Sequence, residues 1–157
     1  MNRHLLLIGV LLIVGCSSGT PGATASPSPK ETSVTLTLSD SGCAYEGPSQ
    51  IPAGVLSITT VNKTQDRFFA NLSLVAEGHS FQDFRAVIAA DAARIKKGEQ
   101  PNGPPTWAAQ ATSNELGPAA SGSLKATVVA GRYVSVCGRI RAGAPIGIWV
   151  GAEITVT

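Results

Sequence analysis

Short segments in which apolar and polar residues alternate recur along residues 33–157, and they constrain the fold more than any other feature of the chain. The segment SVTLTLSD places Val34, Leu36 and Leu38 on one face and hydroxyl groups on the other, the pattern of a half-buried strand. Further strands are expected within 55–64, 67–78, 123–129 and 132–137, with a final strand or pair of strands in 146–157. With 17 Gly and 10 Pro residues to supply turns, these strands predict an all-β Greek-key sandwich.

One segment, HSFQDFRAVIAADAARIKKG, has helical periodicity instead. Apolar residues recur at i, i+3 and i+4 spacing from Phe84 to Ile95, and Ser80 with Asp83 has the spacing of a capping box. We therefore expect one inserted helix over about 80–97 that covers an end or edge of the sandwich. Asp83 and Asp91 fall on its polar side, which predicts that both carboxylates are solvated.

The first 32 residues carry the signals of an exported protein. The apolar run LLLIGVLLIV has the length of a signal peptide and is short for a membrane span. The segment IVGC resembles the lipobox of bacterial lipoproteins, which implies a signal peptide over 1–15 and acyl chains on Cys16. The alternatives are an ordinary secretory signal and an uncleaved anchor.

Residues 16–32 are rich in Ser, Thr, Pro and Gly and are expected to form a flexible tether. The folded domain is then expected to span 33–157. The lipid anchor would make the membrane a partner and would place the domain on the extracytoplasmic face of a bacterial cell membrane.

Three cysteines are present, and lipidation would use Cys16. The other two, Cys43 and Cys137, form an even set in an exported domain, which indicates one disulfide. The alternative is two separate thiols, one of them a metal ligand.

The segments IPAGVLSITTVN, ANLSLV and AGRYVSVCG, in this order, resemble the cupredoxin fold. In addition, CAYEGP and PPTW are similar to segments of small extracytoplasmic cupredoxin-like lipoproteins. The resemblance covers roughly residues 33–157 and implies that the sandwich is cupredoxin-like.

Blue-copper members of this family hold the metal with a thiolate, two histidines and a weak axial methionine. Cys137 matches the thiolate position, but the resemblance places Ala70 and Ile146 at the histidine positions. It places the methionine near Gly151-Ala152, where none is present. The resemblance thus implies a domain without the copper ligands, and we expect no metal and no other cofactor.

An immunoglobulin-like domain is a second possible fold, because Cys43, Trp107 and Cys137 occur in the immunoglobulin order. However, Trp107 follows Cys43 too late to lie on the next strand. Tyr133 also precedes Cys137 by four residues, where that fold has two. These spacings favour the cupredoxin-like sandwich.

The sequence carries no recognisable catalytic set. His79 is the one histidine beyond the signal segment, and no nucleophile elbow, zinc spacing, phosphate loop or dinucleotide fingerprint is present. A net charge of +2 without a basic patch argues against nucleic acid as a partner. We therefore expect that the protein is not an enzyme.

The function predicted from these features is a non-catalytic, membrane-anchored domain that binds a protein, a cell-envelope component or a small ligand. Candidate contact regions are the Gly/Pro loops at 98–106 and 138–147. In the second region, Arg139 and Arg141 could clamp an anion, although solubilising charge is the simpler interpretation. The alternative function is copper capture or delivery, which rests on analogy of fold alone.

Overall fold

The computed structural model describes residues 30–157, so the predicted signal peptide, Cys16 and most of the predicted tether lie outside it. The elements follow one another in the order β1 (Glu31–Ser39), β2 (Gly42–Glu46), β3 (Gln50–Ile51), β4 (Gly54–Asn62), β5 (Arg67–Val75), α1 (Phe81–Lys96), β6 (Ala108–Leu116), β7 (Ser121–Val128), β8 (Gly131–Arg141) and β9 (Ala144–Val156). In the described part of the chain, no helix has the length and apolar character needed to cross a membrane.

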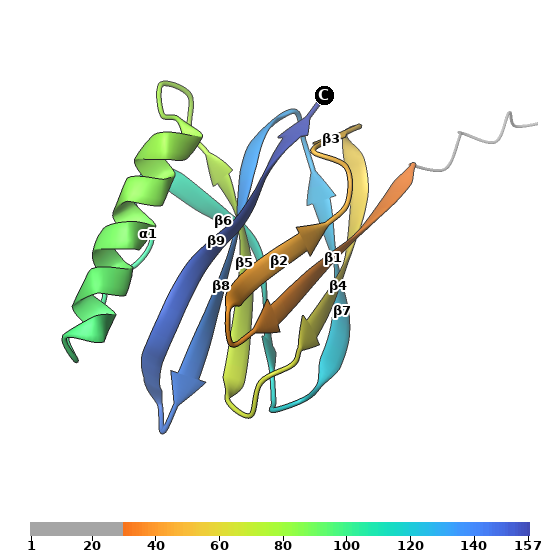
Figure 1. The fold of residues 1–157 in the computed structure, drawn as a ribbon. Helices are drawn as coiled ribbons and strands as arrows, with labels where there is room; N and C mark the ends of the chain where they lie inside the picture. The colour runs from red at the N-terminus through yellow and green to blue at the C-terminus, as the bar shows by residue number, and fades with distance from the viewer. Residues whose placement is uncertain (1–29) are drawn as a thin grey trace, which may run out of the picture.

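The strands form two sheets, with the orders β2-β1-β4-β7 and β3-β9-β8-β5-β6 (Figure 1). The pairs β1–β4 and β3–β9 are parallel, and the other pairs are antiparallel. From the β5–β6 pair the chain crosses to β7 in the other sheet, and β8 then returns beside β5. This path is a Greek key, and the expected all-β sandwich with one helix is confirmed.

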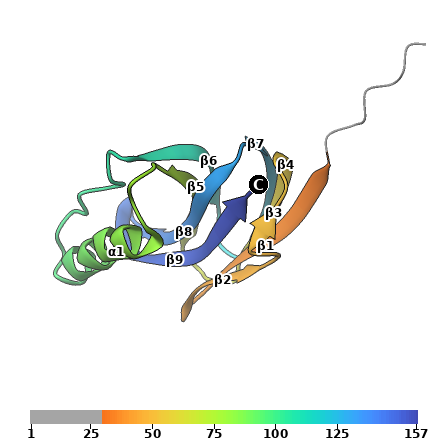
Figure 2. The ribbon, with the colours of Figure 1, turned by 90° about the horizontal axis from the view of Figure 1, so that it is seen from above.

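Apolar side chains fill the space between the two sheets, which face each other in the view from above (Figure 2). The helix α1 covers the outer face of the five-stranded sheet. A second cluster of buried residues lies beneath it: Val75, Phe84, Ile88, Val134 and Val136. The five-stranded sheet is therefore buried on both faces, whereas the four-stranded sheet is buried on one.

The predicted helix is confirmed together with its capping box. The Ser80 side chain accepts a hydrogen bond from the backbone N–H of Asp83 at 3.2 Å, and the Asp83 carboxylate accepts the backbone N–H of Ser80 at 2.7 Å. The hydrogen bonds from the Ser80 hydroxyl and then from its backbone N–H lower the pKa of Asp83. The chain leaves the helix through Gly98, whose φ of 77° favours glycine.

Three local predictions are wrong. No strand was expected in residues 42–51, where β2 and β3 lie, and none in residues 108–116, where β6 lies. The segment 138–147 is a β-hairpin and not a loop, because β8 continues to Arg141 and β9 begins at Ala144. Ala142 and Gly143 form its turn with φ values of 49° and 82°, as a tight hairpin turn of this hand requires.

Candidate functional site

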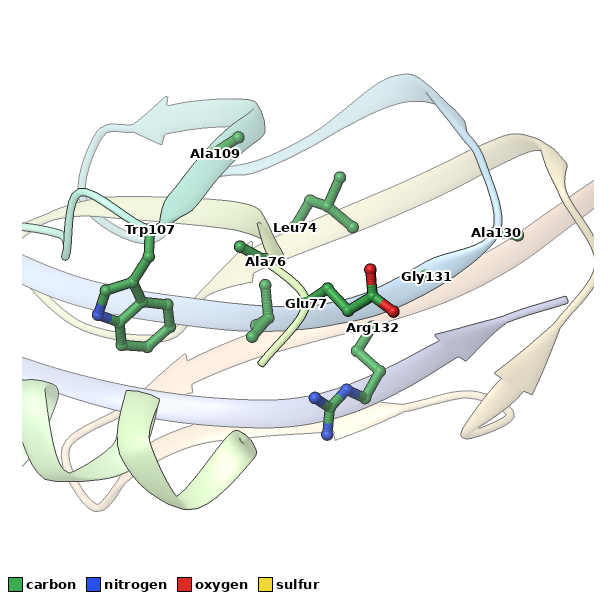
Figure 3. Close-up of a pocket in the computed structure, with 9 residues that line it drawn as sticks. Leu74, Ala76, Glu77, Trp107, Ala109, Ala130, Gly131 and Arg132 are labelled. Carbon is green, nitrogen blue, oxygen red and sulfur yellow. The ribbon is translucent and has the colours of Figure 1, made fainter. Parts of the chain in front are cut away.

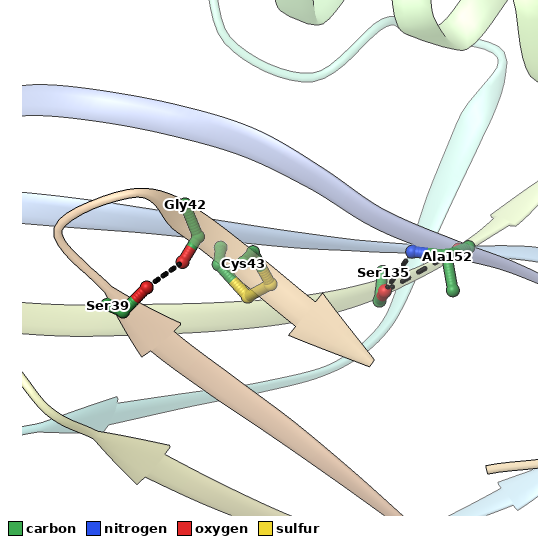
Figure 4. Close-up of a disulfide and its surroundings, with 6 residues drawn as sticks. Ser39, Gly42, Cys43, Ser135 and Ala152 are labelled. Carbon is green, nitrogen blue, oxygen red and sulfur yellow. Dashed lines mark hydrogen bonds between the residues drawn. A yellow bond between two sulfur atoms is a disulfide. The ribbon is translucent and has the colours of Figure 1, made fainter. Parts of the chain in front are cut away.

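The expected disulfide joins Cys43 on β2 to Cys137 on β8 and so links the two sheets (Figure 4). The two Cα atoms lie 5.9 Å apart, and Cys137 is completely buried in the core. Close by, the backbone N–H of Ala152 donates to the Ser135 hydroxyl at 2.8 Å, which fastens β9 to β8. The sulfur at the thiolate position of a blue-copper site is therefore part of a covalent cross-link between sheets.

The residues around Cys137 do not fit a copper ion. Its partners in the sheet are Ala70 on β5 and Trp149 on β9, and neither side chain can ligate the metal as an imidazole does. Ile146 lies three residues before Trp149, or about 10 Å away along the strand, on the exposed hairpin. A Cβ atom at Gly151 would lie 2.5 Å from the Ser135 hydroxyl and 3.1 Å from the Cys43 sulfur, so a methionine has no room there.

Arg139 and Arg141 lie on one face of β8, and both bind the nearly buried carboxylate of Asp66. Arg141 donates from Nε to Oδ1 at 2.7 Å and from Nη2 to Oδ2 at 2.9 Å. Arg139 donates from Nη2 to Oδ2 at 2.7 Å and reaches Asp40 with Nη1 at 2.9 Å. Hydrogen bonds from Arg141 and then Arg139 hold the pKa of Asp66 below its usual value, although burial opposes them.

The anion between the two arginines is thus a side chain of the same protein. The Arg139 side chain is 16% exposed and that of Arg141 is 64% exposed, so Arg141 keeps the larger accessible surface. Contact of these arginines with a partner stays a prediction. Their geometry adds a structural role, because they tie the β4–β5 connection and the turn at Asp40 to the end of β8.

An open groove of about 490 Å³ lies at the opposite end of the sandwich (Figure 3). Its walls come from residues 74–77 at the end of β5, from the start of β6, and from the β7–β8 turn at 130–132. The lining is largely aliphatic and small, and Glu77 and Arg132 add one charge of each sign. A mostly apolar concave surface with a few polar groups is the usual form of a ligand site.

Trp107 forms the aromatic wall of this groove. Its indole stacks on the His79 ring with the centroids 4.1 Å apart and the planes at 6°, and it meets Phe84 edge-on at 5.9 Å. The Arg132 guanidinium donates a hydrogen bond to the backbone carbonyl oxygen of His79. These contacts fix the aromatic pair and the arginine beside the N-terminus of α1.

The sequence did not single out Glu77, Arg132 or Asp66, and it placed Asp91 wrongly. Asp91 was expected on the solvated side of the helix, but it is 1% exposed. Its carboxylate accepts backbone N–H groups of Asn102 and Gly103, so the fold of loop 98–106 buries it. The available signal was the helical spacing, because Asp91 lies three residues after Ile88 and four before Ile95 and so falls on the apolar stripe.

Comparison with known proteins adds a similarity of fold. No protein-family model and no curated protein matches the chain. Among solved structures it is similar to auracyanin A, a "blue" copper protein from the green thermophilic photosynthetic bacterium Chloroflexus aurantiacus, at 13% identity, with 82% of this chain and 100% of that chain covered and a TM-score of 0.48. Reduced auracyanin from the photosynthetic bacterium Roseiflexus castenholzii is 19% identical, with 80% of this chain and 97% of that chain covered and a TM-score of 0.43. Reduced rusticyanin is 18% identical, with 83% of this chain and 81% of that chain covered and a TM-score of 0.45. Because these TM-scores are below 0.5, the sandwich architecture is assigned from the strand order and packing of this chain itself.

Proposed function

We propose that the protein is a bacterial, membrane-anchored extracytoplasmic lipoprotein whose cupredoxin-like sandwich binds a ligand or protein partner without catalysing a reaction. The observation that carries this proposal is the groove between Trp107, Glu77 and Arg132. Its apolar floor can take the less polar face of a ligand, while the two charged groups can orient the polar ends.

The anchor is proposed at Cys16, from the lipobox-like segment. Strand β1 begins at Glu31, which pairs with Val55 on β4, and Gly54 in turn pairs with Val128 just before the β7–β8 turn. The chain therefore enters the domain at the same end as the groove. With a lipid on Cys16, the tether would join the domain at the end that carries the groove, and envelope components would be within its reach.

Copper handling is the alternative function, and no observation favours it over ligand binding. It would need a donor set other than the one used by blue-copper proteins, because the Cys137 sulfur is bonded to Cys43. Elemental analysis of the purified full-length protein distinguishes the two functions. One copper per chain after exposure to copper and desalting would contradict the binding proposal and support the alternative.

The groove can be tested with soluble muropeptides, which carry sugar rings, carboxylates and amines. In a Trp149→Phe background, the fluorescence of Trp107 reports on the groove alone, since the chain has two tryptophans. We expect a saturable change that is lost in Arg132→Ala and kept in Arg67→Ala, which removes an arginine at the opposite end. No saturable change, or equal binding by both variants, would contradict a role for this groove.

The anchor is tested by Cys16→Ser. We expect this variant to lose labelling by radioactive palmitate and to leave the membrane fraction. Unchanged labelling, or membrane retention at the wild-type level, would contradict lipidation at this residue.

A further inference from the structure

A second pocket, of about 150 Å³, lies between α1, loop 98–106 and the outer face of the five-stranded sheet. Much of its wall is apolar, with Phe69 from the sheet and Phe84 and Ile88 from the helix. A pocket of this volume holds a molecule about as large as benzene. It is separate from the groove at the sandwich end, and its residues have no part in the function proposed above.

Asp91 brings a carboxylate into this apolar surrounding. Its Oδ1 accepts the N–H of Asn102 at 2.8 Å, and its Oδ2 accepts the N–H of Gly103 at 3.1 Å. Within residues 30–157, no lysine, arginine or histidine forms an ion pair with it. A carboxylate can accept about four hydrogen bonds, so acceptor capacity is left over. A buried negative charge is costly until a positive group joins it, which favours a cation at this position.

Strand β5 supplies two more polar groups to the same pocket, Asn71 and Ser73. Ser73 is 4% exposed, and its hydroxyl makes no hydrogen bond to another residue in the described range. Across residues 30–157, no completely enclosed side-chain nitrogen or oxygen lacks a partner. The free Ser73 hydroxyl therefore faces the space of the pocket, where a bound molecule can reach it.

We propose that this pocket binds a small primary ammonium compound with an apolar body. An ammonium group has three N–H donors, and Asp91, Asn71 and Ser73 supply acceptor oxygens for them. The phenyl rings of Phe69 and Phe84 accommodate the apolar body and favour a nearby cation. A hydrated metal ion would gain nothing from these apolar walls.

The proposal is tested by calorimetric titration of the full-length protein, in non-ionic detergent and an amine-free phosphate buffer. The probes are n-butylammonium, 1-butanol and butyrate, which share a body and differ in charge. We expect one butylammonium per chain, bound about tenfold or more tightly than butanol, and no binding of butyrate, because hydrogen bonds to a charged group are the stronger ones. Equal affinities for butylammonium and butanol, or no saturable binding of butylammonium, would overturn the proposal.

Variants then assign the binding to this pocket. Asp91→Asn keeps the shape and removes the charge, and we expect it to weaken butylammonium binding about tenfold. Ser73→Ala leaves the loop contacts of Asp91 in place and should weaken binding by a smaller factor, so it provides the test if Asp91→Asn does not fold. Glu99→Gln, which removes an exposed acid from the same loop, is the matched control and should bind as the wild type does. Unchanged affinity in Ser73→Ala and in a folded Asp91→Asn would place the ligand elsewhere and overturn the proposal.

Discussion

Replacing both Cys43 and Cys137 by alanine should cost a large share of the protein's stability. The disulfide closes a loop between residues 94 positions apart. In the chain-entropy description, a cross-link over a loop of this length restricts the unfolded chain by about 4.7 kcal/mol at 25 °C. Small domains are stable by roughly 5–15 kcal/mol in all, so the loss is a large share of the total.

Urea unfolding followed by far-ultraviolet circular dichroism measures this loss. Reduced wild-type protein keeps both sulfur atoms and loses only the cross-link, so it should lose about 4–5 kcal/mol. The double alanine variant also empties part of the core, because Cys137 is completely buried, and should lose somewhat more. Reductant should destabilise the wild type and leave the variant unchanged. A loss below about 1 kcal/mol in both samples would refute the reasoning, since loop closure at this separation predicts a far larger effect.

Three further changes test separate parts of the structure. Asp66→Asn should reduce the acid sensitivity of the folded state. The pKa of Asp66 is lowered in the folded state, chiefly by Arg141, so its stabilisation is complete above the unfolded pKa of about 3.9 and is lost as the pH falls through the folded value. Denaturation at a series of pH values should show a shallower fall for the variant below about pH 4, and parallel curves would contradict this. Ser80→Ala should lower the free energy of unfolding by about 1 kcal/mol, because the helix loses its cap. Urea unfolding measures this loss, and an unchanged free energy of unfolding would mean that the cap does not stabilise the helix. Gly138→Ala should lower the free energy of unfolding by about 2 kcal/mol, because its Cβ would overlap the Phe69 ring. If the variant is as stable as the wild type, the ring moves aside freely and the reasoning fails.

The sequence was sufficient where structure depends on neighbours along the chain. The helix was predictable because Ser80 and Asp83 cap it three residues apart and Gly98 ends it, all within local reach. The disulfide was predictable from the two cysteines, Cys43 and Cys137, that follow a segment with the sequence features of an export signal. Both inferences need no knowledge of which strands pair.

The missed strands are edge strands, and their position explains the failure. β2 pairs only with β1, and β6 only with β5, so each has limited contact with the core. The residues of β6, AAQATSNEL, are mostly polar and show no clear alternation of apolar residues, because none of them is fully buried. Strand preference depends on this packing context, which the sequence of the strand itself does not contain.

The arginine cluster and the buried Asp91 depend on contacts between distant parts of the chain. Asp66 meets Arg139 and Arg141 across more than seventy residues, and only the β5–β8 pairing brings them together. Asp91 lies on the apolar stripe of the helix, seven residues after Phe84 and three after Ile88, so the helical spacing itself indicated that it is buried. It becomes buried because loop 98–106 folds over it and donates two N–H groups. The arginine cluster could not be predicted without the pairing of the strands, and the hydrogen-bond partners of Asp91 could not be predicted without the path of the loop.

The length of β8 explains why Ile146 lies far from Cys137. A metal ligand at position 146 would require the chain to turn soon after Cys137, but β8 runs four residues further to Arg141. Ile146 therefore lies on the hairpin, away from the Cys137 sulfur. At the same end of the sandwich, Asp66 binds Arg139 and Arg141, although Arg141 keeps an accessible surface. Two concave surfaces lie at the opposite end and beneath α1. The two sites proposed for binding are these surfaces, and Ile146, the residue that the sequence resemblance placed at a copper-ligand position, lines neither of them.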